Sequence, residues 1–437
     1  MKRLILAIVL AISALNLMSQ VDSVKTEQFS IHAQTTTINQ SKLAFSVPYS
    51  GENSLRPAAE NQTSLTSTLF LAANLWKGAS IYFNPELAGG SGLSGALGVA
   101  ASTNGETFRV GDPSPTIYLA RIYYKQIFAL TDQQEYRTSD FNQLAGYVPT
   151  KYIGLKIGKI GMADFFDMIK YSHDPRTHFI SWGLMNNGAW DYPANTRGYT
   201  PSAVLEYVSP MHEWRYALSL VPVLANGSVM NWDVAHAFSH TLEYTHKHSI
   251  NGHAGAVRLL AFYTAANMGH YLDAVAQNPT TPDISLVRKI GNTKYGFAMN
   301  AEQDITSDLG VFVRGSWNDG KHETWMFTEI DHSVSGGLVL TGERWKRKND
   351  NIGLAFVASG ISPDHIAYLK AGGNGFMLGD GNLNYGWEKL TELYYMYELK
   401  KDMIYLSGFY QLVFNPGYNK DRQGPVNVFS LRLHVRI

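Results

Sequence analysis

The feature that most constrains the fold of this chain is an alternation of apolar and polar residues with a period of two, which recurs throughout the sequence after residue 20. The C-terminal segment shows it best, with Phe429, Leu431, Leu433, Val435 and Ile437 on one face and Ser430, Arg432, His434 and Arg436 on the other. Successive side chains of a β-strand point to opposite faces, so the pattern predicts strands with one apolar and one polar face.

The connections between these segments alternate in length. Lys400–Asp402 is a very short turn, whereas the next connection, Asn415–Pro425, is long and polar. Outer-membrane barrels combine short periplasmic turns with longer outer loops and carry aromatic girdles, which the 25 Tyr, 20 Phe and 9 Trp could supply. About 417 residues after a leader, at about 26 per strand with its turns, predict an all-β, transmembrane antiparallel β-barrel of about 16 strands.

The N-terminus predicts export. Lys2 and Arg3 precede an apolar run from Leu4 to Leu15, which is too short to span a membrane as a helix. We interpret residues 1–20 as a signal peptide and residues 21–437 as a single outer-membrane β-barrel domain. Zero formal net charge argues against a nucleic-acid partner. The absence of cysteine from the sequence excludes disulfides, thiolate metal sites and cysteine nucleophiles.

Two motifs suggest other functions but have simpler interpretations. Gly90–Gly95 matches G-x-G-x-x-G, yet loop residues follow it in place of the helix that a dinucleotide site needs. Asp380–Asn384 opens like a calcium loop, but position twelve is Thr391 where glutamate is required. Because no catalytic motif is recognisable, we expect neither an enzyme nor a cofactor or bound metal.

Two alternative functions stay open at this point. His236, His240, His246 and His248 share the parity of one strand face, which could gather several imidazole ligands. This pattern motivates an outer-membrane channel for divalent cations such as manganese. Soluble β-sandwiches also alternate, so an exported soluble carbohydrate-binding β-protein is a further possibility.

The chain resembles the OprB family of carbohydrate-selective outer-membrane porins over nearly all of the mature sequence. The resemblance rests on the order of these strings: IHAQTTTINQ (31–40), VPYSGENSL (47–55), LWKGASIYFNPELAGGSGLSGALGVA (75–100), NNGAWDYPANTRGYT (186–200), WNDGKHETW (317–325), YLKAGGNGFMLGDGNLNYG (368–386) and NPGYNKDRQGPVNVFSLRLHV (415–435). Two features depart from the family: the chain ends in Ile437 where such porins usually end in Phe, and the turn at 422–424 carries an extra residue.

The resemblance implies a 16-stranded barrel in the outer membrane of a Gram-negative bacterium. Such a barrel passes monosaccharides and other small polar solutes by passive diffusion, without an energy source or cofactor. Its implied partners are sugar solutes, outer-membrane lipid and lipopolysaccharide, and the barrel assembly machinery during biogenesis. The oligomeric state stays open.

The polar segment from Asp164 to Tyr199 is too long for a hairpin turn, so we expect it to fold inward as a constriction loop. Aromatic rings can stack on the C–H faces of a sugar, while charged groups bond to its hydroxyls. The candidates from this loop are Asp164, Asp167, Trp190, Asp191, Tyr192 and Arg197, and strand parity adds Arg121, Lys125, Arg314 and Glu392 as pore-lining residues. Any of these side chains could instead hold the loop to the wall.

Overall fold

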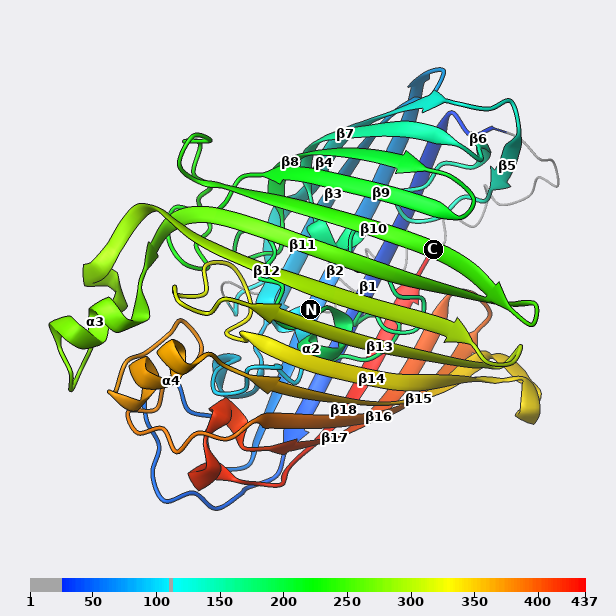
Figure 1. Cartoon of the computed structure of the whole chain (residues 1–437). Coiled ribbons are helices and arrows are strands. Elements are labelled where there is room, and N and C mark those ends of the chain that lie inside the picture. The colour runs from blue at the N-terminus through cyan, green and yellow to red at the C-terminus, as the bar shows by residue number, and fades with distance from the viewer. Residues whose placement is uncertain (1–25, 110–112) are drawn as a thin grey trace.

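The computed structural model describes residues 26–109 and 113–437. Within these ranges sixteen antiparallel strands form a closed barrel, in which strands adjacent along the wall also follow one another in sequence (Figure 1). They are β1 (Phe29–Lys42), β2 (Glu60–Trp76), β3 (Ala79–Gly90), β4 (Thr116–Ala129), β7 (Tyr152–Ile160), β8 (Thr200–Val208), β9 (His212–Ser219), β10 (Phe238–Ile250), β11 (His253–Gly269), β12 (Arg288–Asp304), β13 (Leu309–Asn318), β14 (His332–Gly342), β15 (Arg347–Gly360), β16 (Glu388–Lys400), β17 (Ile404–Phe414) and β18 (Val426–Arg436). A separate hairpin comprises β5 (Gln134–Arg137) and β6 (Gly146–Pro149).

The barrel closes where the two ends of the chain meet. β1 pairs with β2 on one side and with β18 on the other, for example through Thr37 opposite Leu433. The predicted fold class is therefore confirmed. The proposed signal peptide, residues 1–20, lies outside the described residues.

The alternation seen in the sequence separates a lipid-facing wall from the lumen. In β18 the outward side chains of Phe429 and Leu431 are 47% and 52% exposed, whereas the inward side chain of Arg432 is 0% exposed. An apolar outer face and a polar inner face are what a barrel in a bilayer requires. None of the helices in the described part of the chain is long and apolar enough to cross a membrane.

Long connections gather at one end of the barrel, and the other end carries short turns together with the longer connection 130–151. The long ones are 43–59, 91–115, 161–199, 220–237, 270–287, 319–331, 361–387 and 415–425, and they include the helices α2 (Trp182–Met185), α3 (Tyr271–Gln277) and α4 (Pro363–Lys370). β1 begins and β18 ends at the short-turn end. By the usual geometry of such barrels, the short-turn end is periplasmic and α3 and α4 lie outside the cell, whereas α2 lies inside the barrel (Figure 1).

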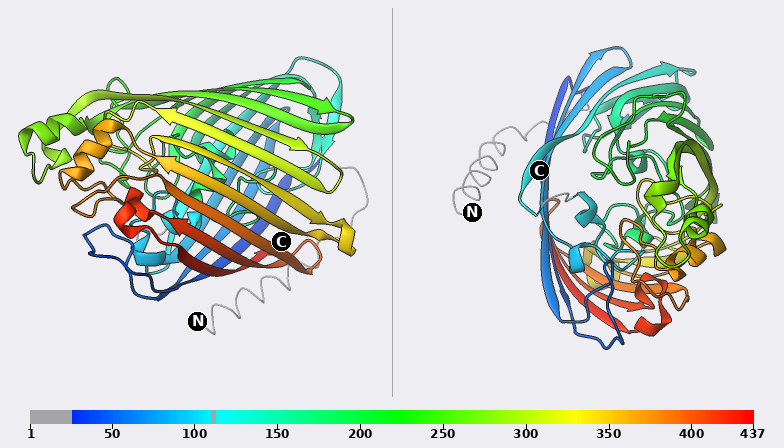
Figure 2. Two further views of the ribbon diagram at one scale, coloured as in Figure 1. Left: turned by 60° about the horizontal axis from the view of Figure 1, so that its bottom comes forward. Right: turned by 90° about the vertical axis from the view of Figure 1, so that its left-hand side faces the viewer.

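The lumen is largely occupied by chain. In the view along the barrel of Figure 2, connecting segments lie inside the ring of strands. The expected constriction loop, 161–199, is one of them. The connection 91–115 is another, and its Gly-rich start, with Leu93, Ala100 and Ala101 all buried, packs against the wall and the constriction loop. The G-x-G-x-x-G match is thus part of an inward-folded loop.

Candidate functional site in the barrel lumen

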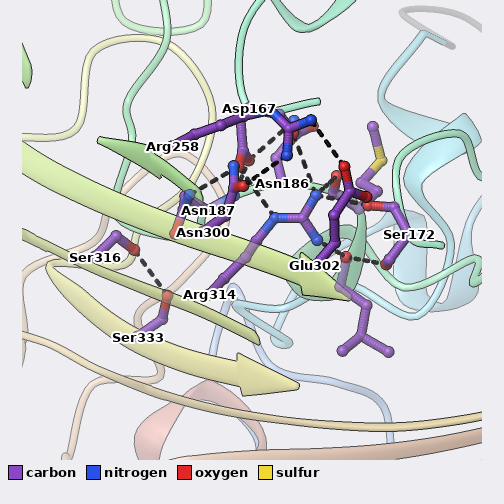
Figure 3. A network of polar contacts seen from close by, with 12 residues as sticks. Asp167, Ser172, Asn186, Asn187, Arg258, Asn300, Glu302, Arg314, Ser316 and Ser333 are labelled. Carbon is purple, nitrogen blue, oxygen red and sulfur yellow. Dashed lines mark hydrogen bonds and ion pairs between the residues drawn. The ribbon is translucent and has the colours of Figure 1, made fainter. Parts of the chain in front are cut away.

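The constriction loop is anchored to the β13 wall by a buried ion pair (Figure 3). Arg314 Nε donates to Asp167 Oδ1 at 3.2 Å, and both side chains are at most 1% exposed. Asn300 on β12 also donates to Asp167 Oδ1, at 2.6 Å. Arg314 further donates to the carbonyls of Leu184 and Ser172 at 2.7 and 2.5 Å. Arg314 and Asp167, two of the predicted site residues, therefore bond to each other and to the loop.

β16 and β18, farther along the same side of the ring, also anchor the loop through its backbone groups. Glu392 on β16 accepts hydrogen bonds from the amides of Ile180 and Ser181 at 2.7 and 2.9 Å. Arg432 on β18 donates to the carbonyls of Pro175 and His178 at 2.7 and 2.6 Å. Burial and, to a lesser extent, the nearby Arg432 charge lower the pKa of His178 to about 4. These bonds provide the partners that a loop inside a barrel needs for its buried backbone groups.

The predicted aromatic and acidic triplet Trp190, Asp191 and Tyr192 lies under the neighbouring outer loop, 319–331. Asp191 accepts from the amides of three consecutive residues, Trp325, Met326 and Phe327, at 2.8, 2.9 and 2.9 Å. Tyr192 stacks on Phe327 with ring centroids 4.8 Å apart. Trp190 meets Phe166 edge-on and is 1% exposed. This triplet thus joins two inward loops in a dry cluster.

The remaining predicted residues are Arg121 and Lys125 on β4 and Asp164 and Arg197 in the constriction loop, and all except the buried Arg121 are partly exposed. Arg121 donates through Nε and Nη2 to the two carboxylate oxygens of Asp164 at 2.6 and 2.7 Å. The Asp164 side chain is 29% exposed. The guanidinium of Arg197 lies 4.2 Å from the centroid of the Tyr118 ring. Lys125 is half-buried on the same inner face.

A local irregularity sets which β4 side chains point inward. Opposite β4, the register shifts between Asn84, which pairs with Arg121, and Pro85, which pairs with Leu119. Proline has no N–H to continue the ladder, so it is tolerated at such a break. Ala120 is the extra residue, and from Arg121 onward alternate residues face the lumen.

Two inward carboxylates that hold the loops, Glu86 on β3 and Glu388 on β16, were not among the predicted site residues. Arg176 of the constriction loop pairs with Glu106 at 2.8 Å and with Glu86 on β3 at 3.2 Å. Glu388 on β16 accepts from the amides of Ala100 and Ala101 at 3.0 and 2.7 Å. Strand parity could have identified Glu86 and Glu388 as inward residues, but their loop partners are distant in sequence.

A periplasmic segment also enters the barrel, which the sequence did not predict. The connection 130–151 is much longer than the other described turns at that end, and its residues 138–145 cover the inner wall of β1 and β2. Phe141 stacks on Phe70 with centroids 4.4 Å apart. Asp140 pairs with Arg436 at 2.6 Å, and Ser139 contacts His32 at 2.9 Å. The lumen is therefore narrowed from both ends.

The histidine-rich stretch lies on the outside of the wall. His240 bonds to Tyr216 at 2.6 Å on the face that also carries Leu242, which is 44% exposed, whereas Thr241 and Glu243 point inward and are at most 1% exposed. His236 precedes β10 and pairs with Asp233 at 2.9 Å. No group of three metal-ligating side chains is present among the described residues. The histidines on β10 that motivated a divalent-cation channel therefore do not face the lumen.

Chemically, the lumen combines fixed loops with a limited set of partly open polar groups. The buried pairs hold the loops in place, and the side chains of Asp164, Lys125 and Arg197 are partly exposed. Within the described part of the chain, the loops that enter the lumen narrow it from both ends.

Comparison with known proteins agrees with this geometry. The family model of the carbohydrate-selective porin, OprB family, matches residues 52–437. The chain is similar to Pseudomonas putida OprB in a high-pH structure, with a TM-score of 0.69 and 16% identity over 94% of both chains. The low-pH structure of that protein gives a TM-score of 0.52 at 12% identity over 94% of this chain and 93% of that one.

The outer membrane channel DcaP of Acinetobacter baumannii is also similar, with a TM-score of 0.52 and 11% identity over 94% of this chain and 97% of that one. The comparison with curated proteins finds no match. At these identities the solved structures establish the barrel fold, while the family match covers most of the chain. This protein therefore belongs to the OprB family of carbohydrate-selective porins and is a β-barrel of the outer membrane.

Proposed function

We propose that this porin passes monosaccharides and other small polar solutes by passive diffusion, along the strip of lumen between β4 and the constriction loop. The proposal rests on a difference in exposure between the side chains that hold the constriction loop and those that face the lumen. Arg314 and Asp167 are at most 1% exposed, whereas the side chain of Asp164, bonded to Arg121, is 29% exposed. A rigid loop beside open hydrogen-bonding groups favours selective passage with rapid release.

We assign the predicted site residues two kinds of role on this basis. Asp167, Asp191, Arg314 and Glu392 are positioning residues, because their polar atoms bond to loop backbone or to each other. Trp190 and Tyr192 stabilise the contact between loops. Asp164, Lys125 and Arg197 are the residues that contact solute, and the buried Arg121 holds the Asp164 carboxylate in place. No step in this passage requires an energy source, a cofactor or bond chemistry.

The test is sugar-dependent blockade in planar lipid bilayers. Stepwise conductance that falls as glucose or maltose is added supports a sugar channel. Arg121→Ala is expected to weaken the blockade about tenfold, because it removes the hydrogen bonds that hold the Asp164 carboxylate and a hydrogen bond to a charged group contributes about 1.5 kcal/mol. Arg344→Ala serves as the control, since Arg344 lies in the periplasmic turn after β14 and its side chain is 62% exposed. Conductance indifferent to both sugars would contradict the proposal.

We further propose the biogenesis that such a barrel requires. Residues 1–20 act as the export signal, and the mature barrel is inserted by the assembly machinery into a membrane of lipid and lipopolysaccharide. Mass spectrometry of the protein from outer membranes is expected to give a mature N-terminus near residue 21. Retention of residues 1–20 in the membrane-inserted protein would contradict this proposal.

A further inference from the structure

Lys125 is a lumen-facing cation without a bonded partner. Its side chain shares the inward face of β4 with those of Arg121 and Tyr123, and it is half-buried. Among the described residues it makes no hydrogen bond or salt bridge. A lysine held at a partly dry inner wall without a counter-ion is unfavourable, because burial penalises the charged form.

A second lysine stands directly opposite it. Lys125 and Lys156 are register partners across β4 and β7, so both side chains point to the same face. Like charges directly opposite each other in a sheet are destabilising. Glu206 pairs with Lys156 at 2.5 Å and also accepts from Arg215 at 3.3 Å. This carboxylate is already shared by two cations, and Lys125 lies beyond its bonding distance.

The charges around this pair leave positive charge in excess. Three carboxylates face four cations: Glu206, Glu213 and Glu243 against Lys125, Lys156, Arg215 and Lys247. The neighbouring Arg121–Asp164 and Arg137–Glu135 pairs are one-to-one and leave this balance unchanged. Lys125 is the cation in excess.

Unsatisfied hydrogen-bonding groups lie two inward positions away along the same inner face. Asn84, the register partner of Arg121, is 0% exposed, and neither its amide nitrogen nor its amide oxygen has a partner. Arg121 Nη1 is also buried without a partner. Arg121 and Lys125 are four residues apart, about 13 Å along an extended strand, and their long side chains can shorten that gap.

We infer that the strip from Lys125 to Arg121 and Asp164 favours anionic monosaccharides, in which a sugar carries one carboxylate or phosphate. The anionic group would bind at the partly exposed Lys125, beside the buried charge of Lys156, and hydroxyls would meet the partly exposed Asp164 carboxylate that Arg121 holds. The inference rests on the proposed sugar passage and adds the class of sugar. Passage stays reversible because Lys125 is a single, partly hydrated charge.

The test compares uptake into liposomes loaded with the full-length mature porin. Potassium glucuronate, glucose 6-phosphate and neutral glucose are supplied at equal concentration, with the membrane potential clamped at zero by valinomycin. The wild-type protein is expected to pass at least one anion faster than glucose, and the two anions distinguish carboxylate from phosphate recognition. This preference should shrink in 1 M salt, where charges are screened within about 3 Å.

Substitutions locate the preference. Lys125→Gln is expected to lower the ratio of anion to glucose flux about fivefold, which corresponds to about 1 kcal/mol of lost attraction. Lys125→Arg should retain the ratio, and Lys401→Gln, in the exposed periplasmic turn between β16 and β17, should leave it unchanged. Reversal potentials in a KCl gradient should move toward cation selectivity in Lys125→Gln alone.

The outcomes separate this inference from the proposed function. Glucose flux that equals or exceeds the flux of both anions in the wild-type protein overturns the inference and leaves the proposed function standing. An anion preference unchanged in Lys125→Gln overturns it as well. Ion conductance without passage of any sugar would overturn the proposed function and this inference together. The comparison of anion and glucose flux through the wild-type protein tests the inference even where a variant fails to assemble.

Discussion

Carboxylates that accept backbone amides are the recurring residue-scale device of this barrel. Asp191 accepts three amides of the 319–331 loop, and Glu392 accepts two of the constriction loop. Glu388 accepts two amides of the 91–115 loop and one from Gly417. A non-helical loop in the lumen leaves many N–H groups unpaired, and the oxygens of a carboxyl group can accept several of them.

Arg314 offers a direct test of this anchoring. Arg314→Gln would remove bonds to Asp167 and to loop carbonyls, leaving the Asp167 carboxylate buried without its counter-ion. We expect a loss of about 3 kcal/mol in unfolding free energy, typical of a broken buried pair. Urea unfolding in detergent micelles measures it. Lys170→Gln is the matched control, because its side chain is 63% exposed in a pair with Asp304; equal destabilisation by both would refute the anchoring role.

Glu329 predicts a pH dependence of the outer loops. It is buried in the 319–331 loop and accepts from the amides of Met377 and Leu378 at 3.0 and 2.7 Å. Burial raises its pKa from the ordinary 4.5 to about 8. The folded protein therefore binds this proton more tightly than the unfolded chain does. The stability that this group contributes is full below the unfolded pKa and is lost as the pH rises through the folded pKa.

The expected result is a difference between two pH profiles. The unfolding free energy of the wild-type protein should fall relative to Glu329→Gln between about pH 5 and pH 8, because glutamine stays neutral. Thermal unfolding at a series of pH values measures it. Glu343→Gln, with a side chain 47% exposed, is the control. Parallel profiles for the wild-type protein and Glu329→Gln would refute the assignment.

At the scale of elements, glycine makes room for a loop to reach the wall. A Cβ at Gly310 on β13 would lie 1.8 Å from Cζ of Tyr171 in the constriction loop, so only glycine permits this approach. Tyr171 also bonds to Asp304 of β12. Each segment that enters the lumen contacts particular wall residues: the constriction loop at Gly310, the 91–115 loop at Glu388 and segment 138–145 at Phe70. Together these segments narrow the lumen.

The periplasmic segment 138–145 is expected to limit conductance. Phe141→Ala would remove its stack on Phe70 and its contact with Arg436, whose guanidinium lies 4.5 Å from the ring centroid. We expect a higher single-channel conductance or more frequent large openings, since the segment then loses its aromatic contacts with the wall. Phe128→Ala, at an outward position 54% exposed, is the control. Unchanged conductance in Phe141→Ala would show that the segment does not restrict the mouth.

At the scale of the whole molecule, closure of the sheet leaves no free strand edge. Every strand of the ring has two hydrogen-bonded neighbours, and the first and last strands pair with each other. All backbone polar groups within the membrane can therefore be satisfied inside the sheet, the condition for crossing a bilayer. The pairing of the chain's two ends is also the longest-range contact of the fold, so complete closure requires the full chain.

Closure predicts a characteristic behaviour in detergent. The protein is expected to leave membranes only with detergent and to migrate as a compact folded band in SDS unless it is heated. Electrophoresis of heated and unheated samples measures this. Recovery of the protein in aqueous buffer, or identical mobility with and without heating, would be incompatible with the barrel.

The sequence by itself determined the strands, their number and the identity of the two faces, because alternation is a local property that every strand carries independently. The inward parity of Arg314 and Glu392 follows in the same way. Only the tertiary structure decided what those side chains touch. Arg314 meets Asp167, and Glu392 meets Ile180, across more than a hundred residues of chain. Such pairings depend on how loops fold back into the lumen, which no local pattern encodes; the entry of segment 138–145 was unforeseen for the same reason.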